Sequence, residues 1–212
     1  STSRGLGDVY KRQTLLRAGL LKGSFIPDKT FRELRHLTRY RKSIVRDITA
    51  QKNRIDKFLQ SSGFRFTAFL SDAFGASGRN IIRHLMEYGN ISREALDRCL
   101  KTQTRKRIDE ILIALNGSLS EHQRGFLRMI FGHLEALEQH RHTVEDAITK
   151  EITKHEEALS LLCSIPGIDV TAAAAIIAEI GTDMSAFPDS QHICSWAGLS
   201  PVSYTHLRAH ET

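Results

Sequence analysis

Histidines and carboxylates are the residues of this sequence best suited to acid–base or metal chemistry, and their spacing argues against both. The chain of 212 residues has 10 His and 24 Asp or Glu. The acidic residues between 135 and 157 occupy polar positions of one expected helix, and the histidines of that region lack ligand-like spacing. No Ser-His-Asp order or phosphate-cradling glycine loop is recognisable. The residues therefore predict no catalytic group and no metal ligand.

A basic stretch is the first candidate for binding. From residue 31 to 57, nine Lys or Arg stand against three acidic residues, and this excess equals the net charge of the chain, +6. Such a helix can lie along a nucleic-acid backbone, where each cation that contacts a phosphate releases counterions. A solvated helix face is the alternative. The predicted nucleic-acid contacts of this stretch are Arg32, Arg35, Arg39, Arg41, Lys42 and Arg46.

A proline-glycine turn is the second candidate. The string SIPGIDVTAAAAIIAEIG places this turn between a helix end and a new helix that we expect Asp169 to cap and Gly181 to close. This is the helix-hairpin-helix pattern, in which the glycine allows close approach and backbone amides donate to a phosphate. A compact hairpin whose isoleucines pack inside is the alternative. The predicted contacts here are Pro166, Gly167, Ile168, Asp169 and Thr171.

Long amphipathic helices must position both candidates. Thr30 and Glu33 form an expected capping box for a helix over 30–60, in which apolar residues recur at helical spacing. Ser118 and Glu121 are expected to open a longer helix to about residue 158, whose apolar seam requires a partner. We expect the first helix to fold back on the second as an antiparallel coiled-coil arm. A bundle, or pairing with a second subunit, remains the alternative.

Shorter helices are expected between and after the long ones. A Gly/Ser turn at 75–78 introduces one helix, Ser92 is the expected cap of the next, and a further helix is predicted over about 104–115. Near the end of the chain, Asp189 or Ser190 is the expected cap of a short helix that runs through Trp196.

The composition agrees with an all-α fold and a cytoplasmic protein. The chain is 41% hydrophobic and 25% charged, with only four prolines and 7% aromatic residues. Its three cysteines form no C-x-x-C pair, which argues against a disulfide framework and a cysteine zinc site. There is no apolar run of about 18 residues, so we expect no membrane span.

Five strings in order carry a family resemblance over about residues 14–201: TLLRAGLLKGSFIP, FRELRHLTRYRKSIV, SDAFGASGR, LLCSIPGIDVTAAAAIIAEIG and DMSAFPDSQHICSWAGLSP. Together they resemble the DEDD-type transposases of the bacterial insertion-sequence one-ten family. The resemblance implies a RuvC-like domain with four magnesium-binding acidic residues, a coiled-coil linker domain and a transposase domain with a serine nucleophile. It also implies DNA cleavage and rejoining guided by a structured bridge RNA.

The resemblance also implies a domain order. Residues 14–29 would be the end of the RuvC-like domain and a connector, 30–158 the helical coiled-coil domain, and 159–201 the helix-hairpin-helix start of the transposase domain. Residues 1–13 and 202–212 lack any hydrophobic period and resemble translated linker sequence.

Neither catalytic motif of the family is recognisable where the resemblance expects it. Asp8 lies in a linker-like string, and Ser203 and Thr205 lie near the expected place of the nucleophile without its usual neighbours. We therefore expect an internal transposase fragment that binds DNA and bridge RNA and forms a homo-oligomer. We expect it to lack cleavage activity and a cofactor of its own, with Mg²⁺ serving the full-length enzyme. A non-catalytic helix-hairpin-helix DNA-binding module and a coiled-coil assembly protein are the alternatives.

Overall fold

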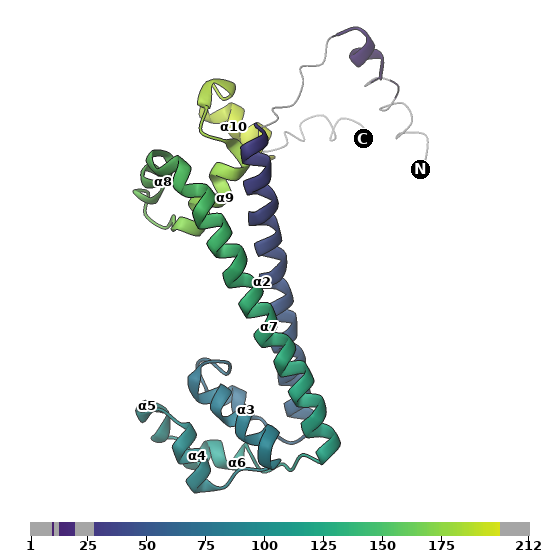
Figure 1. The fold of residues 1–212 in the computed structure, drawn as a ribbon, viewed down its shortest axis with the longest axis vertical. Helices are drawn as coiled ribbons and strands as arrows, with labels where there is room; N and C mark the ends of the chain where they lie inside the picture. The colour runs from purple at the N-terminus through teal and green to yellow at the C-terminus, as the bar shows by residue number, and fades with distance from the viewer. Residues whose placement is uncertain (1–9, 11–12, 20–27, 200–212) are drawn as a thin grey trace, which may run out of the picture. The chain divides into compact units, whose positions relative to one another are not determined.

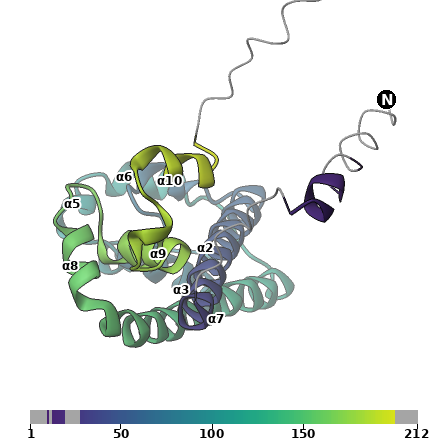
Figure 2. The same ribbon diagram turned by 90° about the horizontal axis from the view of Figure 1, so that it is seen from above.

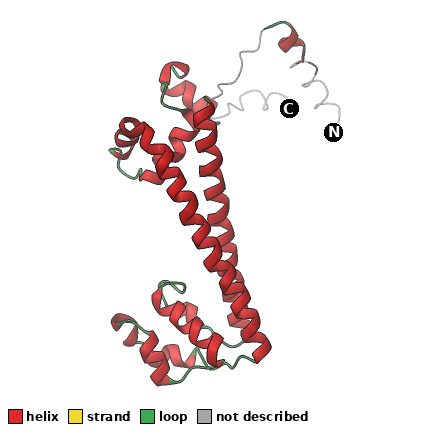
Figure 3. Ribbon diagram, in the orientation of Figure 1, coloured by secondary structure: helices red, strands yellow, loops and turns green. Residues whose placement is uncertain are grey.

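The computed structural model describes residue 10, residues 13–19 and residues 28–199 (Figure 1). Within these ranges the regular structure is helical and contains no strand, which confirms the all-α prediction (Figure 3). The chain divides into two compact units, residues 36–154 and residues 1–35 with 155–212. The linker-like segment 202–212 and most of 1–13 lie outside the described residues.

Two long antiparallel helices form the frame of unit 36–154. They are α2 (Lys29–Ser61), most of which belongs to this unit, and α7 (Glu121–Ile152), and they lie side by side in Figure 1. The direction follows from three contacts, in which residue numbers rise along one helix and fall along the other: Arg41 with Glu145, Gln51 with Ile130, and Phe58 with Phe126. The expected fold-back of the first helix on the second is therefore observed.

Apolar side chains from both helices fill the seam. From Ile44 onward the buried residues of α2 recur every three or four residues, and those of α7 follow helical spacing on either side of a gap between Leu134 and Val144. Each fully buried Leu or Ile side chain contributes about 1.5–3 kcal/mol to stability, so the seam is the main stabilising feature of the pair. The buried seam residues are Ile44, Ile48, Ile55, Leu59, Leu127, Ile130, Leu134, Val144, Ile148 and Ile152.

Two predicted helix starts were wrong by one or two residues. Because α2 already begins at Lys29, Thr30 lies inside the first turn and does not cap it. The side chain of Ser120 caps α7 in a capping box with Gln123, two residues beyond the predicted pair. The pair Ser118 and Glu121 and the pair Ser120 and Gln123 both have the spacing that a capping box requires, so sequence alone does not show which of them caps α7.

Short helices connect α2 to α7. They are η1 (Phe66–Phe69), α3 (Ala76–Tyr88), α4 (Arg93–Cys99), α5 (Thr102–Arg105) and α6 (Ile108–Ile113). The single helix predicted over 104–115 is wrong, since α5 and α6 are separate. The side chain of Ser92 accepts a hydrogen bond from the Ala95 amide and caps α4, as predicted. Gly78 lets α3 approach the preceding loop, because a Cβ there would lie 1.8 Å from the Ala73 carbonyl oxygen.

The remaining helices follow a break at η2 (Thr153–His155). This 3₁₀ turn ends α7 before residue 158, so the predicted end of the longest helix was too late. The helices that follow, shown from above in Figure 2, are α8 (Glu156–Cys163), α9 (Val170–Ile180), η3 (Met184–Ala186) and α10 (Ser190–Trp196). The predicted caps Asp169 of α9 and Asp189 of α10 are both observed.

Candidate nucleic-acid interface

The side of α2 that faces away from the seam carries exposed cations. Arg39, Lys42, Arg46 and Lys57 are exposed and follow one another at spacings of three, four and eleven residues. These spacings are close to one, one and three turns of a helix, so the four side chains lie along one face, here called the basic stripe. From the first to the last is 18 residues, or about 27 Å at 1.5 Å per residue.

Little negative charge balances the basic stripe. Within the described part of the chain, Lys42, Arg46 and Lys57 form no ion pair. Asp47 follows Arg46 directly and therefore projects about 100° around the helix. Asp56 is half-buried and accepts a hydrogen bond from the side-chain amide of Gln60 at 2.8 Å. The stripe is therefore a local concentration of positive charge.

Two of the predicted basic contacts bind protein groups instead of facing solvent. Arg41 is about one-quarter exposed and pairs with Glu145 of α7, with its Nη2 at 2.7 Å from the carboxylate. Arg35 donates to the carbonyl oxygen of Glu179 at 2.7 Å and pairs with the carboxylate of the same residue at 2.9 Å. A cation at the carboxyl end of α9 also meets the negative end of that helix dipole. Both arginines therefore stabilise the fold.

The other predicted basic residues are exposed. Arg32 lies on the first turn of α2, and Arg39, Lys42 and Arg46 belong to the basic stripe. Lys57 completes the stripe although it was not among the predicted contacts. Its signal was in the sequence, because it lies eleven residues after Arg46 and hence on the same face.

The predicted hairpin is a tight turn between α8 and α9. Gly167 has a φ of +90°, a conformation that favours glycine, and no atom lies within 4 Å of the place its Cβ would take. Pro166 and Thr171 are exposed beside it. The side chain of Asp169 accepts a hydrogen bond from the Ala172 amide at 2.7 Å, so its carboxylate caps α9. The backbone of this turn is open to solvent.

Apolar side chains surround the turn without being covered. Leu161, Ile165 and Val170 are 72%, 48% and 53% exposed, and Ile168 is half-buried. The alternative in which the isoleucines pack inside a compact hairpin therefore fails for Ile165. An uncovered apolar cluster of this kind is typical of a contact surface for another molecule.

The charge around the turn does not favour a phosphate. Residues 155–199 include six Asp or Glu and no Lys or Arg. A phosphate there would receive hydrogen bonds from backbone amides alone, in a negative surrounding field. The basic stripe of α2 is therefore the stronger candidate for a nucleic-acid contact, and the contacts predicted for the turn stay predictions.

The described residues do not form a metal centre. No three His, Cys, Asp or Glu side chains among them come together in a way that could hold a metal ion. None of the described helices is long and apolar enough to cross a membrane.

Two family models match the chain. Residues 159–205, which contain most of α8 and all of α9 and α10, match the model of the transposase IS116/IS110/IS902 family, and residues 13–63 match a DEDD transposase model of IS110. The chain belongs to the IS110 transposase family. In this IS110-family chain, the second match includes all of α2 and its basic stripe, and it extends across the predicted domain boundary at residues 29 and 30. No curated protein and no solved structure matches the chain.

Proposed function

We propose that α2 is a nucleic-acid-binding helix of this transposase and that its basic stripe lies along the phosphate backbone of DNA. The observation that carries this proposal is the exposure of Lys42, Arg46 and Lys57 on one face without a paired acid among the described residues. Transposases cleave and rejoin DNA, so a surface of this charge has an evident ligand in the family.

The geometry of the stripe suits a duplex. Its length of about 27 Å matches a stretch of B-form DNA that carries about 16 phosphates on its two strands, because the duplex has one charge per ~1.7 Å of its axis. Each cation that contacts a phosphate releases condensed counterions, and the gain in free energy does not depend on base sequence. The stripe would therefore hold and orient DNA, and it would leave the choice of target to other parts of the enzyme.

RNA is a second ligand of the same surface. The resemblance to the insertion-sequence one-ten family implies a structured bridge RNA, and its phosphates carry the same charge as those of DNA. We propose that the stripe accepts either backbone. Competition between a DNA duplex and a structured RNA for one preparation of the protein measures which is preferred.

We further propose that the 212-residue chain binds DNA without cleaving it. The family's catalytic motifs were not recognisable around Asp8, Ser203 or Thr205, and all three residues lie outside the described ranges. Mg²⁺ is proposed as the cofactor of the full-length enzyme. Incubation of supercoiled plasmid with the chain and Mg²⁺ tests this, with no nicked product expected. A nicked product that disappears when a chelator is added would contradict it. A cytoplasmic location stays a prediction.

A charge-neutralised variant tests the DNA-binding proposal. Binding to a fluorescent 25-base-pair duplex is measured by anisotropy for the wild type and for a stripe variant that carries Lys42→Gln, Arg46→Gln and Lys57→Gln. The matched control variant carries Arg65→Gln, Lys106→Gln and Lys150→Gln, which are exposed residues outside the stripe. We expect the stripe variant to bind at least tenfold more weakly and the control to bind nearly as well as the wild type. Equal losses in both variants would contradict the proposal.

A second candidate function, self-assembly, is favoured by the uncovered apolar cluster beside the α8–α9 turn. Leu161, Ile165 and Val170 are exposed in a region without basic residues, which is better suited to protein than to phosphate contact. We propose that this surface contributes to a homo-oligomer. Analytical ultracentrifugation of the wild type and of Leu161→Glu tests this, with a shift towards monomer expected in the variant. An unchanged sedimentation coefficient would contradict it.

A further inference from the structure

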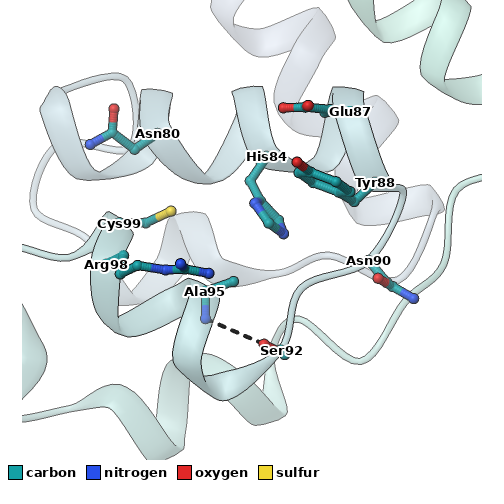
Figure 4. A pocket seen from close by; sticks show the side chains of 9 residues that line it. All are labelled: Asn80, His84, Glu87, Tyr88, Asn90, Ser92, Ala95, Arg98 and Cys99. Carbon is teal, nitrogen blue, oxygen red and sulfur yellow. Dashed lines mark hydrogen bonds between the residues drawn. The ribbon is translucent and has the colours of Figure 1, made fainter.

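A polar cleft lies between α3 and α4, on a different part of unit 36–154 from the basic stripe (Figure 4). Its volume is about 670 Å³, within the range of small-molecule sites. Side chains from both helices and from the loop between them line it, among them Asn80, His84, Tyr88, Asn90, Arg98 and Cys99.

Two aromatic rings form one side of the cleft. The ring centroids of His84 and Tyr88 are 4.6 Å apart, with planes tilted by 36°. Tyr88 is 59% exposed, so much of its ring is available to a ligand. A hydrogen bond to Glu87 raises the pKa of Tyr88, and burial lowers the pKa of His84. Both rings are therefore uncharged at neutral pH and suited to stacking.

A cation lies across the cleft from the rings. Arg98 is exposed on the last turn of α4, and its guanidinium extends towards the ring of His84 (Figure 4). Among the described residues it forms no ion pair. Nearby Asp97 pairs with Arg105 at 3.2 Å, and the Glu87 carboxylate lies by the Tyr88 hydroxyl. The charge of Arg98 is thus available to an anion in the cleft.

We infer that the α3–α4 cleft binds one unpaired nucleotide of a nucleic-acid strand, with its base on the rings of Tyr88 and His84 and its phosphate at Arg98. Aromatic side chains beside a cation are the combination by which proteins bind single strands, because every base has a π face and every nucleotide a phosphate. Asn80 and Asn90 add amide donors and acceptors at the rim for base edges. A paired base cannot enter, because its faces are covered by its neighbours in the duplex.

This inference goes beyond the proposed role of the stripe, since it concerns bases and single strands instead of a duplex backbone. The shared chemistry of the ligand is an unstacked nucleotide, and its source is either DNA or RNA. Two fluorescent probes of 15 nucleotides distinguish them, oligo(dT) and oligo(U), with the 25-base-pair duplex as a third probe.

Substitution of Tyr88 is the main test. We expect Tyr88→Ala to bind at least one single-stranded probe about fivefold or more weakly, the loss that removal of one stacked base gives, and to leave duplex binding unchanged. Tyr88→Phe keeps the ring and should bind the probe as the wild type does. Tyr40→Ala, which removes an exposed tyrosine of α2, is the control. Single-strand binding by Tyr88→Ala that equals that of Tyr40→Ala would overturn the inference.

Arg98 supplies a second, independent readout. Arg98→Gln should lower the slope of log affinity against log salt for the single-stranded probe by about 0.7, the value for one lost phosphate contact, whereas Arg98→Lys should keep it. An unchanged slope in Arg98→Gln would also overturn the inference. The stripe variant distinguishes the two proposals. Its duplex binding tests the role of the stripe, and single-strand binding by Tyr88→Ala tests the role of the cleft, so either proposal can fail while the other holds.

Discussion

The salt dependence of DNA binding is a quantity that the basic stripe predicts numerically. Three exposed cations of the stripe that form no ion pair among the described residues, Lys42, Arg46 and Lys57, are placed to contact phosphates. Each phosphate contact contributes about 0.9 to the slope of log affinity against log salt for a duplex, so these three should contribute about −2.7 to the slope of the wild type. Through this contribution, a rise from 50 to 200 mM salt would weaken binding about 40-fold.

The stripe variant removes these three cations. Its slope should therefore be shallower than that of the wild type by about 2.7, and the same rise in salt should weaken its binding about 40-fold less. The assay is fluorescence anisotropy with the 25-base-pair duplex at 50, 100 and 200 mM KCl. Circular dichroism melts confirm that each variant is folded.

The control variant tests whether position matters or only net charge. It removes the same three positive charges from Arg65, Lys106 and Lys150, so a general attraction between a basic protein and DNA would be reduced equally. We expect its slope to stay near the wild-type value. If the stripe and control variants have the same slope, the assignment of phosphate contacts to α2 is refuted.

Three further predictions concern stability, measured by urea denaturation. Gly78→Ala should lower the free energy of unfolding by about 1–3 kcal/mol, because the new Cβ would overlap a backbone carbonyl oxygen. Gly125→Ala should raise it by about 0.5–1 kcal/mol, because nothing lies within 4 Å of the place its Cβ would take. Equal effects of the two substitutions would argue against the close approach at Gly78. Gln51→Ala should cost about 1–3 kcal/mol, since its buried amide donates to the Ile130 carbonyl oxygen at 2.6 Å, and an unchanged unfolding curve would contradict that contact. Burial lowers the pKa of His84 below 6.5 in the folded state, so the stability that the neutral imidazole contributes is complete above about pH 6.5 and is lost as the pH falls towards the folded pKa. His84→Gln should remove this part of the pH dependence of the free energy of unfolding. An identical pH profile in the variant would exclude the imidazole as the source.

The spacing of apolar residues was sufficient to predict the frame of this fold. Ile44, Ile48, Ile55 and Leu59 mark one face of α2, and the opposite face is then fixed by the helical period. From that period alone, Lys57 could have been assigned to the same face as Arg46. Helix ends were less predictable, because Thr153–His155 contains neither Gly nor Pro to signal the end of α7.

The roles of individual arginines could not be predicted from charge. Arg35 meets Glu179, which is 144 residues away in sequence, and Arg41 meets Glu145 across the seam. Neither partner can be identified without the tertiary structure, so a count of basic residues overestimates the number available to DNA. The cleft beside Tyr88 and Arg98 could not be predicted from the sequence either, since its two sides come from separate short helices.

The most direct measurement for the proposed function is the reactivity of individual lysines with and without DNA. The chain is acetylated by an N-hydroxysuccinimide ester, alone and with saturating duplex, and each lysine is quantified by mass spectrometry. The proposal predicts that DNA protects Lys42 and Lys57 and leaves the exposed Lys106 and Lys150 unprotected. Equal acetylation of Lys42 and Lys57 in the presence and absence of bound duplex would contradict it.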